Sequence, residues 1–284
     1  MKKFLAIVLP LVFALSLTAC GGKKADAANM LEAIINSGTL TVSLSPDFAP
    51  MEFIDPSKEG QDQYQGFDIE LAKYIAAKLS EKYNTEITLE IEAMDFDSCQ
   101  LSVGSKQVHM SISGYSWTEE RAENYLISDF YYAGDNESEQ WVIALADTAA
   151  TLGDAAAFDG VSVAAQNASL QLNMVNEQLP NAEAVVITSL DTAILELVNG
   201  KVDALACAQG QAEVFMNQYP EIAKCGFQFA VTEEESANAI LMPLGEDELC
   251  AVINEILAEA LAEGVYATWY EDSVVYAKAL GQME

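Results

Sequence analysis

The residues with the clearest potential for chemistry lie in the segment 113–121, which reads SGYSWTEER. Thr118 fits the N-cap of a helix, and this places Arg121 at the third position of the first turn. A capping box favours Glu or Gln there, and the positive end of the helix dipole repels a cation. A departure from a local rule without visible compensation often marks a functional site. Since a guanidinium grips a carboxylate through two parallel hydrogen bonds, Arg121 is predicted to hold the carboxylate of a small ligand.

The same pattern has a second interpretation. Arg121 can be a surface residue that pairs with Glu119 or Glu123 of its own helix. The local sequence alone does not choose between the two.

The first 20 residues resemble an export signal. Lys2 and Lys3 precede an apolar run at 4–17, which is about 21 Å long as a helix and too short for a hydrocarbon core of about 30 Å. Residues 1–19 are therefore predicted to be a signal peptide. The ending LTAC resembles a bacterial lipobox, which predicts lipidation at Cys20, a tether over 20–35, and a protein anchored to the membrane on the outer cell surface. The alternative is an ordinary signal peptide with an incidental cysteine.

Composition narrows the classes of partner. The formal net charge of −31 repels nucleic acid and anionic lipid, so neither is expected as a partner. With 51% hydrophobic residues the chain can build a large core. About 250 residues after the tether predict two domains or lobes. No later segment has the length and apolarity of a membrane span.

Cysteine and histidine usage points away from metal. The four cysteines after Cys20 are spaced unlike any metal or redox motif, and buried free thiols are expected, although export permits disulfides. The single histidine, His109, precedes a strand-like run without a second histidine nearby. No metal or cofactor is predicted. The four cysteines are Cys99, Cys207, Cys225 and Cys250.

Strand and helix patterns alternate along most of the chain, which predicts an α/β protein with parallel sheets flanked by helices. Strands are expected at 39–43, 86–92, 110–113, 141–145, 161–165, 184–187, 202–207, 226–231 and 239–242. Helices are expected from Asp68 through an apolar face at Leu71, Ile75 and Leu79, over 96–105, from Thr118, over 169–178, from Asp191 to 198, up to about 218, and over 247–263.

Two polar segments, 133–138 and 232–236, fit crossings between lobes. They predict a first lobe made of 36–137 and 231–284, and a second lobe, 138–230, inserted into it. A cleft between two α/β lobes is a common place for a ligand, because strand ends and helix N-termini meet there.

Seven short motifs, in order, resemble one family, the amino-acid-binding solute receptors of ABC importers (family 3). They span residues from about 40 to 270 and are PDFAPMEF at 46–53, GFDIELA at 66–72, DFD at 95–97, SGYSWTEER at 113–121, SDFYY at 128–132, QNASLQ at 166–171 and GKVDA at 200–204. The resemblance implies a two-lobed, periplasmic-binding-protein-like fold of type II that closes on its ligand.

The resemblance also implies roles for individual residues. Arg121 would take the α-carboxylate of the ligand, and Ser113, Gly114 and Ser116 would line the same wall. Ser169 would approach from the second lobe at a helix start, where backbone N–H groups favour an anion.

Two aromatic residues complete the implied site. Phe48 and Phe96 occupy positions where the family often uses flat side chains to sandwich the ligand, with core packing as the alternative for each.

One position departs from the family pattern. An acid that commonly binds the α-ammonium of the ligand is replaced by Ala208, and a buried ammonium beside a methyl group is unfavourable. Another acid would take its place, or the ligand is not a simple α-amino acid, with Gln209 and Gln211 as neutral donors. Ser45, where receptors for basic amino acids tend to carry an acid, disfavours lysine and arginine. The candidate acids are Asp47, Glu52, Asp97 and Asp191, and Asp191 is counted among the predicted site residues.

The function that follows is binding. We expect a monomeric, lipid-anchored substrate-binding protein that captures an amino acid or similar small carboxylated solute by closure of two lobes. It would deliver the solute to an ABC permease and have no catalytic residues. The alternative is an exported enzyme on the same fold, similar to cyclohexadienyl dehydratase, which would need an acid or base in the cleft.

Overall fold

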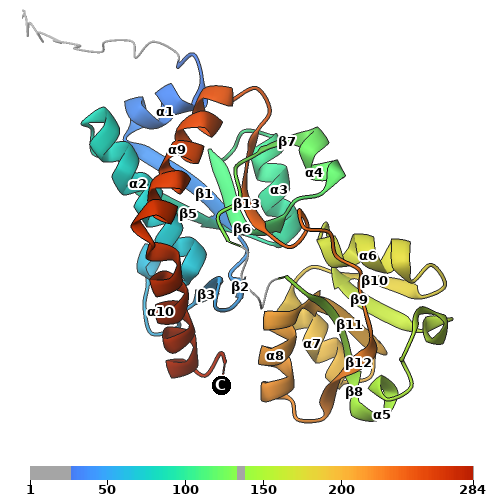
Figure 1. Ribbon diagram of the computed structural model, residues 1–284. Helices are drawn as coiled ribbons and strands as arrows, with labels where there is room; N and C mark the ends of the chain where they lie inside the picture. The colour runs from blue at the N-terminus through green and yellow to red at the C-terminus, as the bar shows by residue number, and fades with distance from the viewer. Residues whose placement is uncertain (1–26, 133–137, 284) are drawn as a thin grey trace, which may run out of the picture.

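The computed structural model describes residues 27–132 and 138–283, which form two α/β lobes (Figure 1). Each lobe contains a five-stranded sheet covered by helices. The predicted signal peptide, Cys20 and the first crossing at 133–137 lie outside the described residues. The predicted two-lobed α/β fold is confirmed.

The sheet of the first lobe has the order β5-β1-β6-β13-β7. β1 pairs in parallel with β5 and β6, whereas β13 runs antiparallel to β6 and β7. The chain therefore returns from the second lobe to place β13 inside a sheet that began 200 residues earlier. The strands are β1 (Thr39–Leu44), β5 (Thr88–Ala93), β6 (Met110–Ser116), β7 (Tyr125–Ile127) and β13 (Asn238–Pro243).

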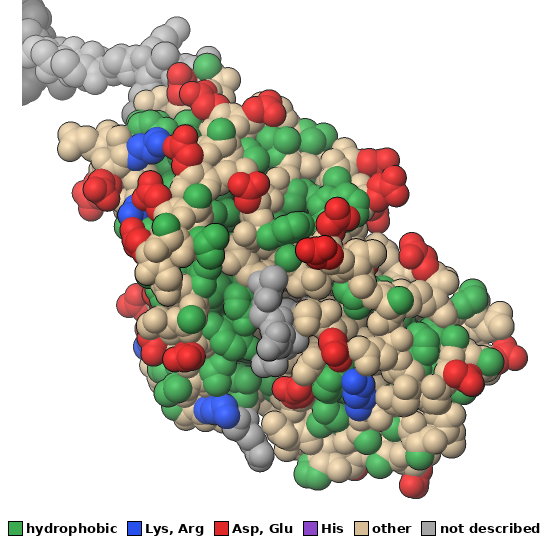
Figure 2. Space-filling view, viewed as in Figure 1, with side chains coloured by type: hydrophobic (Ala, Val, Ile, Leu, Met, Phe, Trp, Pro, Cys, Tyr) green, Lys and Arg blue, Asp and Glu red, His purple; other side chains and the backbone are tan. Residues whose placement is uncertain are grey.

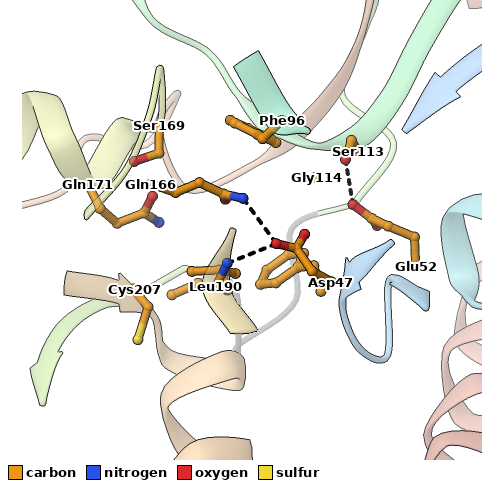
Figure 3. Close-up of a pocket in the computed structure, with 12 residues that line it drawn as sticks. Asp47, Glu52, Phe96, Ser113, Gly114, Gln166, Ser169, Gln171, Leu190 and Cys207 are labelled. Carbon is orange, nitrogen blue, oxygen red and sulfur yellow. Dashed lines mark hydrogen bonds between the residues drawn. The ribbon is translucent and has the colours of Figure 1, made fainter. Parts of the chain in front are cut away.

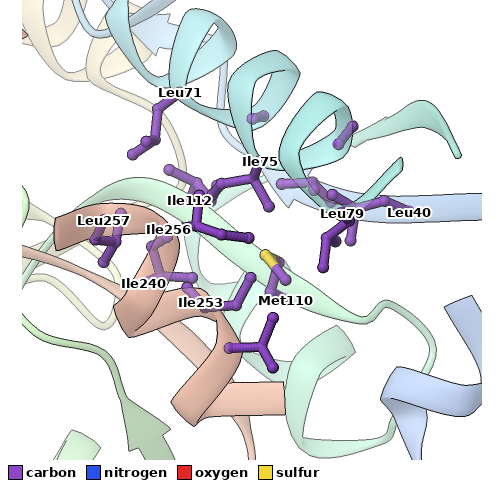
Figure 4. Packing of buried hydrophobic residues seen from close by; sticks show 14 of the residues in the cluster. Leu40, Leu71, Ile75, Leu79, Met110, Ile112, Ile240, Ile253, Ile256 and Leu257 are labelled. Carbon is purple, nitrogen blue, oxygen red and sulfur yellow. The ribbon is translucent and has the colours of Figure 1, made fainter. Parts of the chain in front are cut away.

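Helices α2 (Phe67–Tyr83) and α9 (Asp247–Glu263) pack on this sheet (Figure 4). The predicted apolar face of α2 is fully buried and meets α9 through a common core. The other helices of the lobe are α1 (Met30–Ser37), α3 (Phe96–Gly104), α4 (Glu119–Asn124) and α10 (Val265–Ala279). A small sheet at the lobe's edge contains β2 (Asp47–Phe48), β3 (Glu52–Ile54) and β4 (Tyr64–Gln65), with a 3₁₀ turn at Gly60–Gln63.

Phe67, at the start of α2, joins that helix to the C-terminal helix. Its side chain is fully buried, and five aromatic rings surround it with centroids 5.0–6.4 Å away. The preceding Gly66 has φ +126°, and an added Cβ would lie 2.2 Å from the Met51 carbonyl oxygen. The five rings are those of Tyr131, Tyr132, Tyr266, Trp269 and Tyr270.

The predicted tether extends too far along the chain. Residues 30–37 form α1, whose Leu31 and Ile34 are buried in the core of the first lobe. Asn29 caps this helix by accepting a hydrogen bond from the Glu32 N–H, and Gly38 ends it in the left-handed conformation. The helix is short, but it is stabilised because its apolar side chains pack into the core of the first lobe.

Two predicted helix caps are wrong. α2 begins after Gly66, and Asp68 lies inside its first turn with its carboxylate buried between other elements. α7 (Leu190–Val198) is capped by Ser189, whose hydroxyl accepts from the Thr192 N–H, so Asp191 is a first-turn residue. In both segments the cap lies two positions upstream of the predicted residue.

The sheet of the second lobe has the order β10-β9-β11-β8-β12. β10, β9 and β11 are parallel, whereas β8 is antiparallel to β11 and β12, so both sheets are mixed and not wholly parallel as predicted. The strands are β8 (Gln140–Leu145), β9 (Ser162–Gln166), β10 (Glu183–Ile187), β11 (Ala204–Ala208) and β12 (Ile222–Gln228); the helices are α5 (Ala146–Ala149), α6 (Leu170–Gln178), α7 and α8 (Gln209–Gln218), with a 3₁₀ turn at Ala155–Phe158.

The four cysteines after Cys20 and the single histidine are placed as structural residues of the fold. None of the four cysteines of the described residues forms a disulfide, and Cys99, Cys207 and Cys225 are buried. His109 accepts a hydrogen bond from the Thr41 N–H at Nδ1, and burial lowers its pKa. Within 27–132 and 138–283, no group of acidic, His and Cys side chains is arranged to hold a metal, and no helix has the length and apolarity of a membrane span.

Candidate functional site

A cavity lies between the two lobes, with an empty volume of about 410 Å³ including its open mouth (Figure 3). The first lobe provides acids, phenylalanines and the end of β6, and the second lobe provides the β9–α6 loop and the ends of β11 and α7. The lining residues are Asp47, Phe48, Glu52, Phe96, Ser113, Gly114, Gln166, Ser169, Gln171, Leu190, Cys207 and Ala208.

Five of the eight predicted ligand-binding residues line this cavity: Phe48, Phe96, Ser113, Gly114 and Ser169. They come from β2, α3, β6 and the N-cap of α6, so distant segments converge on one space. Their roles toward a ligand stay predictions. The other three, Ser116, Arg121 and Asp191, lie outside the lining.

Gly114 and Phe48 are fitted to each other. Gly114 adopts φ +57°, and a Cβ there would lie 3.0 Å from Cε1 of Phe48. The N–H of Gly114 donates to Oδ2 of Asp68 at 2.9 Å, so this part of the wall is held by the buried acid. A larger residue at 114 would require Phe48 to shift.

Arg121 is buried, with 4% of its surface exposed. Thr118 caps α4 as predicted, accepting from the Arg121 N–H at 3.1 Å. The guanidinium lies against the rings of Phe96 and Tyr115, with Cζ 5.6 and 5.2 Å from their centroids. Burial lowers the pKa of Arg121 to about 10. The surface-pairing interpretation is therefore wrong, since within the described residues no carboxylate forms a salt bridge with Arg121.

The Arg121 guanidinium donates to protein oxygens on both lobes. Nη1 donates to the Ser116 carbonyl at 2.6 Å, Nε to Oε1 of Gln100 at 3.3 Å, and Nη2 to the Ala168 carbonyl of the second lobe at 2.9 Å. It faces a second, neighbouring cavity that also contains Asp97 and Asn167. Three of the five N–H donors of the guanidinium are thus engaged.

Asp47 connects the two lobes from the first cavity. Its carboxylate accepts from Nε2 of Gln166 at 3.1 Å and from the Leu190 N–H at 2.9 Å, both in the second lobe. The Ser45 hydroxyl also donates to it, at 2.8 Å. Burial raises the pKa of Asp47. Since its oxygens already have three donors, Asp47 acts here as a link between lobes.

Further hydrogen bonds cross between the lobes near residues 167–168. Asn167 donates to Asp97 at 2.8 Å, and Gln100 donates to the Ala168 carbonyl at 3.2 Å. Ala168 adopts φ +57°, a left-handed conformation that directs its carbonyl toward the first lobe. Together with the bonds of Asp47 and Arg121, these contacts hold the lobes in a closed arrangement.

Ser169 and Asp191 differ in their access to the cavity. Ser169 caps α6 and accepts from the Leu172 N–H at 3.1 Å while lining the cavity. Asp191 lies in a separate surface hollow beside Gln218 and Gln282, and burial raises its pKa. Asp191 is therefore placed away from a solute in the first cavity.

Glu52 is the acid best placed toward the cavity. Its side chain is 1% exposed; Oε1 accepts from the Ser113 hydroxyl at 2.6 Å, and Oε2 is buried without a hydrogen-bond partner (Figure 3). Burial raises the pKa of Glu52 well above its usual range, and the charge of Asp68 adds to the shift. The sequence offered Glu52 only as one of four candidate acids. An acidic residue between apolar neighbours in a short strand is the signal that marks it.

Asp68 lies behind Glu52 and is fully buried. It accepts from the Gly114 N–H at 2.9 Å and from the Tyr131 hydroxyl at 2.9 and 3.1 Å. Burial raises the pKa of Asp68 to about 6, against the lowering effect of these hydrogen bonds. Sequence analysis missed this role because it assigned Asp68 to a helix cap.

Glu52→Gln should stabilise the ligand-free protein, and the gain should increase with pH. An acid with a raised pKa in the folded state binds more protons folded than unfolded, so it lowers stability as pH rises from its ordinary pKa to the raised one. Glutamine removes that dependence. Thermal unfolding at about pH 5 and about pH 8 checks this, with exposed Glu90→Gln as the control. Equal melting temperatures for wild type and Glu52→Gln at the higher pH would contradict it.

The second-lobe wall opposite is uncharged. Ala208 and Cys207 end the fully buried strand β11, and Leu190 lies beside them. The position where the family pattern expects an ammonium-binding acid is thus an apolar part of the wall. Gln211 is buried nearby but lines the surface hollow of Asp191 instead.

Known protein families identify the class of protein to which this arrangement belongs. The family model of bacterial extracellular solute-binding proteins, family 3, matches residues 40–273. The chain belongs to this family. Curated relatives include amino-acid-binding proteins of ABC transporters, so the expected family membership is confirmed.

Two relatives of this solute-binding protein are named for binding an amino acid. It is 27% identical over 278 residues to the probable histidine-binding protein of Campylobacter jejuni, a match that covers 94% of this chain and 97% of that protein. It is 33% identical over 136 residues to the arginine-binding extracellular protein ArtP of Bacillus subtilis, and this match spans about half of either chain, 48% and 47%.

A solved structure shares the architecture of this solute-binding protein. An amino acid ABC transporter substrate-binding protein of Streptococcus pneumoniae, bound to L-arginine, superposes with a TM-score of 0.76 at 29% identity. The match covers 89% of this chain and 99% of that one.

Proposed function

We propose that this protein captures an amino acid, or a similar small carboxylated solute, by closing its two lobes and delivers it to the permease of an ABC importer. The observation that carries the proposal is the cavity whose walls come from both lobes, which Asp47 and Arg121 connect by hydrogen bonds. Each lobe alone offers half of the contacts, so binding favours the closed state. The lobe boundaries 138–230 and 231–284 belong to this proposal, with the first lobe beginning at α1, residue 30, and not at residue 36.

The solute is proposed to carry a cationic group that lies against Glu52. The Oε2 atom of Glu52 is buried and lacks a partner, and a cation in the cavity would supply one. Relatives named for arginine and histidine binding support a cationic amino acid. Ser45 disfavoured such a solute by its own position, but the acid seven residues later offers the missing charge.

Arg121 is proposed to bind the carboxylate of the solute. Two of its five N–H donors are free of the hydrogen bonds described above, and its positive charge has no carboxylate partner among the described residues. Arg121 faces the neighbouring cavity, so this role requires the solute carboxylate to reach past Ser169 toward Ala168. Phe48 and Phe96 would enclose the solute between these polar ends.

A thermal-shift panel tests the proposed function. Protein beginning after Cys20 would be unfolded, stripped of ligand and refolded, then tested against amino acids, modified amino acids, short peptides, dicarboxylates, polyamines and sugars. A solute at 100 times its dissociation constant stabilises the protein by about 2.7 kcal/mol. A shift with amino acids supports the proposal. Shifts confined to sugars, or none at all, would refute it.

The enzyme alternative is tested on the same samples. A dehydratase would convert its substrate, and Glu52 is an acid in the cleft with a raised pKa. A cyclohexadienyl alcohol that carries a carboxylate is the probe, and the recovered solute is analysed for loss of water. Unchanged solute supports a binding protein without catalytic residues, and turnover would replace that assignment.

Lipid attachment at Cys20 is proposed to hold the protein at the outer face of the membrane as a monomer. Cys20→Ser should move it from the membrane fraction to the soluble fraction, because the thiol that carries the lipid is absent. Fractionation and immunoblotting of producing cells check this, with Cys250→Ser as the matched control. Membrane association that survives Cys20→Ser would contradict lipidation at this residue.

The acidic surface supports the expectation that nucleic acid is not a partner. Acidic side chains are spread over both lobes on the face that Figure 2 shows, with few Lys or Arg side chains among them. Such a surface disfavours nucleic acid.

A further inference from the structure

Two buried carboxyl groups, those of Glu52 and Asp68, lie close together behind the cavity, and few hydrogen-bond donors surround them. Asp68 has three hydrogen bonds, from the Gly114 N–H and the Tyr131 hydroxyl, whereas Glu52 has one, from Ser113. Oε2 of Glu52 receives no hydrogen bond from a surrounding N–H or hydroxyl group, and the two carboxyl groups interact with each other. The donor set therefore suits one ionised carboxylate at Asp68 and leaves a charge on Glu52 uncompensated.

The groups around Glu52 make a second negative charge there unfavourable. The titratable groups that interact electrostatically with the Glu52 carboxyl are acids, phenols and a thiol. No Lys, Arg or His of the described residues forms a salt bridge with Glu52 or Asp68. The acids are Asp47 of β2 and Asp68 of α2. The phenols are Tyr115 of β6 and Tyr131, which follows β7, and the thiol is Cys99 of α3.

We propose that the Glu52–Asp68 pair holds a proton while the cavity is empty and releases it when the cationic group of a solute binds beside Glu52. The inference rests on the proposed function and adds a proton to its binding equilibrium. Burial, which raises the pKa of both groups, supports it.

The exchange balances in charge. In the empty site the pair carries one proton and one negative charge, and in the loaded site it carries two negative charges and one solute cation. The proton leaves to the solvent, and Ser113 continues to donate to Oε1. Glu52 is the acid that gains the cation, because it lines the cavity and one of its oxygens has no hydrogen-bond donor.

The sign of the pH effect follows from this exchange. Binding favours the deprotonated pair, so affinity falls as pH decreases below the pKa at which the empty pair takes up its proton. One released proton corresponds to about a tenfold loss of affinity per pH unit in that range. The receptor would therefore load at neutral pH and release its solute on acidification.

Calorimetry measures the proton directly. L-arginine, the probe, is titrated into full-length protein at one near-neutral pH in two buffers with different enthalpies of ionisation. The observed binding enthalpy should differ by nearly one proton's worth of buffer enthalpy. Bound L-arginine with the same enthalpy in both buffers would overturn the inference.

Matched variants assign the proton to the pair. Glu52→Gln should bind L-arginine more weakly and release no proton, whereas exposed Glu90→Gln should behave as wild type. Asp68→Asn removes the neighbouring negative charge, so the pKa of Glu52 should fall and less proton should be released on binding. Proton release that persists in Glu52→Gln would overturn the assignment.

A measurement on empty protein does not depend on the solute. The infrared band of a protonated carboxylic acid should be present in wild type and absent in Glu52→Gln, and its absence from wild type would overturn the inference. A thermal shift only with carboxylates that lack an ammonium group would leave the receptor function standing and overturn the cation exchange. No shift with any amino acid or carboxylate would overturn both.

Discussion

Phe67→Ala is expected to destabilise the protein by about 3–5 kcal/mol. The ring is fully buried, and five aromatic rings from the strand end after β7 and from α10 surround it. Alanine would leave a cavity lined by rigid rings, which cannot collapse into it, so both the lost transfer free energy and the cavity add to the cost. Urea denaturation followed by fluorescence of Trp269, which lies 6.4 Å from Phe67, measures the change.

Phe130→Ala is the matched control, because that ring is 45% exposed and its loss should change stability by no more than about 0.5 kcal/mol. Similar effects of the two substitutions would show that the aromatic cluster does not hold α10 to the first lobe. An intact solute affinity in the surviving folded Phe67→Ala protein is expected, since Phe67 does not line the cavity.

Arg121→Ala should weaken binding of a carboxylated solute by at least ~2 kcal/mol, or about 30-fold. The substitution removes the charge proposed to meet the carboxylate. It also removes the Arg121 donor from the Ser116 carbonyl and one of the two donors from the Ala168 carbonyl, and with the latter one bond between the lobes. Calorimetry with a solute that gives a thermal shift measures the loss.

Arg121→Lys separates charge from geometry. Lysine keeps a positive charge, but its ammonium cannot reproduce the fork that contacts Gln100, Ser116 and Ala168 together. We expect intermediate affinity. Wild-type affinity in Arg121→Ala would refute the carboxylate role and leave Arg121 as a structural residue alone.

Most elements of the fold could be predicted from local patterns. The 247–263 helix matches α9 at both ends, and the 96–105 helix differs from α3 by one residue, because each has a regular apolar face. α10 and α1 were missed. The burial of α10 comes from contacts with α2 and α9, and α1 is short and follows a polar stretch, so neither has a strong local signal.

The site was less accessible to sequence reasoning, because it depends on which atoms already have partners. The resemblance placed Phe48, Phe96, Ser113, Gly114 and Ser169 at one cavity, and they line it. The pairing of Glu52 with Asp68 depends on the folding of β3 against α2, which no local pattern encodes. The orientation of Arg121 depends on the left-handed Ala168 carbonyl from the other lobe.

The position of β13 has a consequence for the order in which the protein folds. The five strands of the second lobe occupy one uninterrupted stretch, so that lobe can complete its sheet once residue 228 has emerged. The first lobe cannot, because β13 pairs with both β6 and β7 and arrives only at residues 238–243. A chain that emerges from its N-terminus therefore holds an incomplete N-terminal sheet while the later lobe forms. During that interval the edges of β6 and β7 that β13 later covers are unpaired, and this is when the nascent protein is most exposed to intermolecular strand pairing.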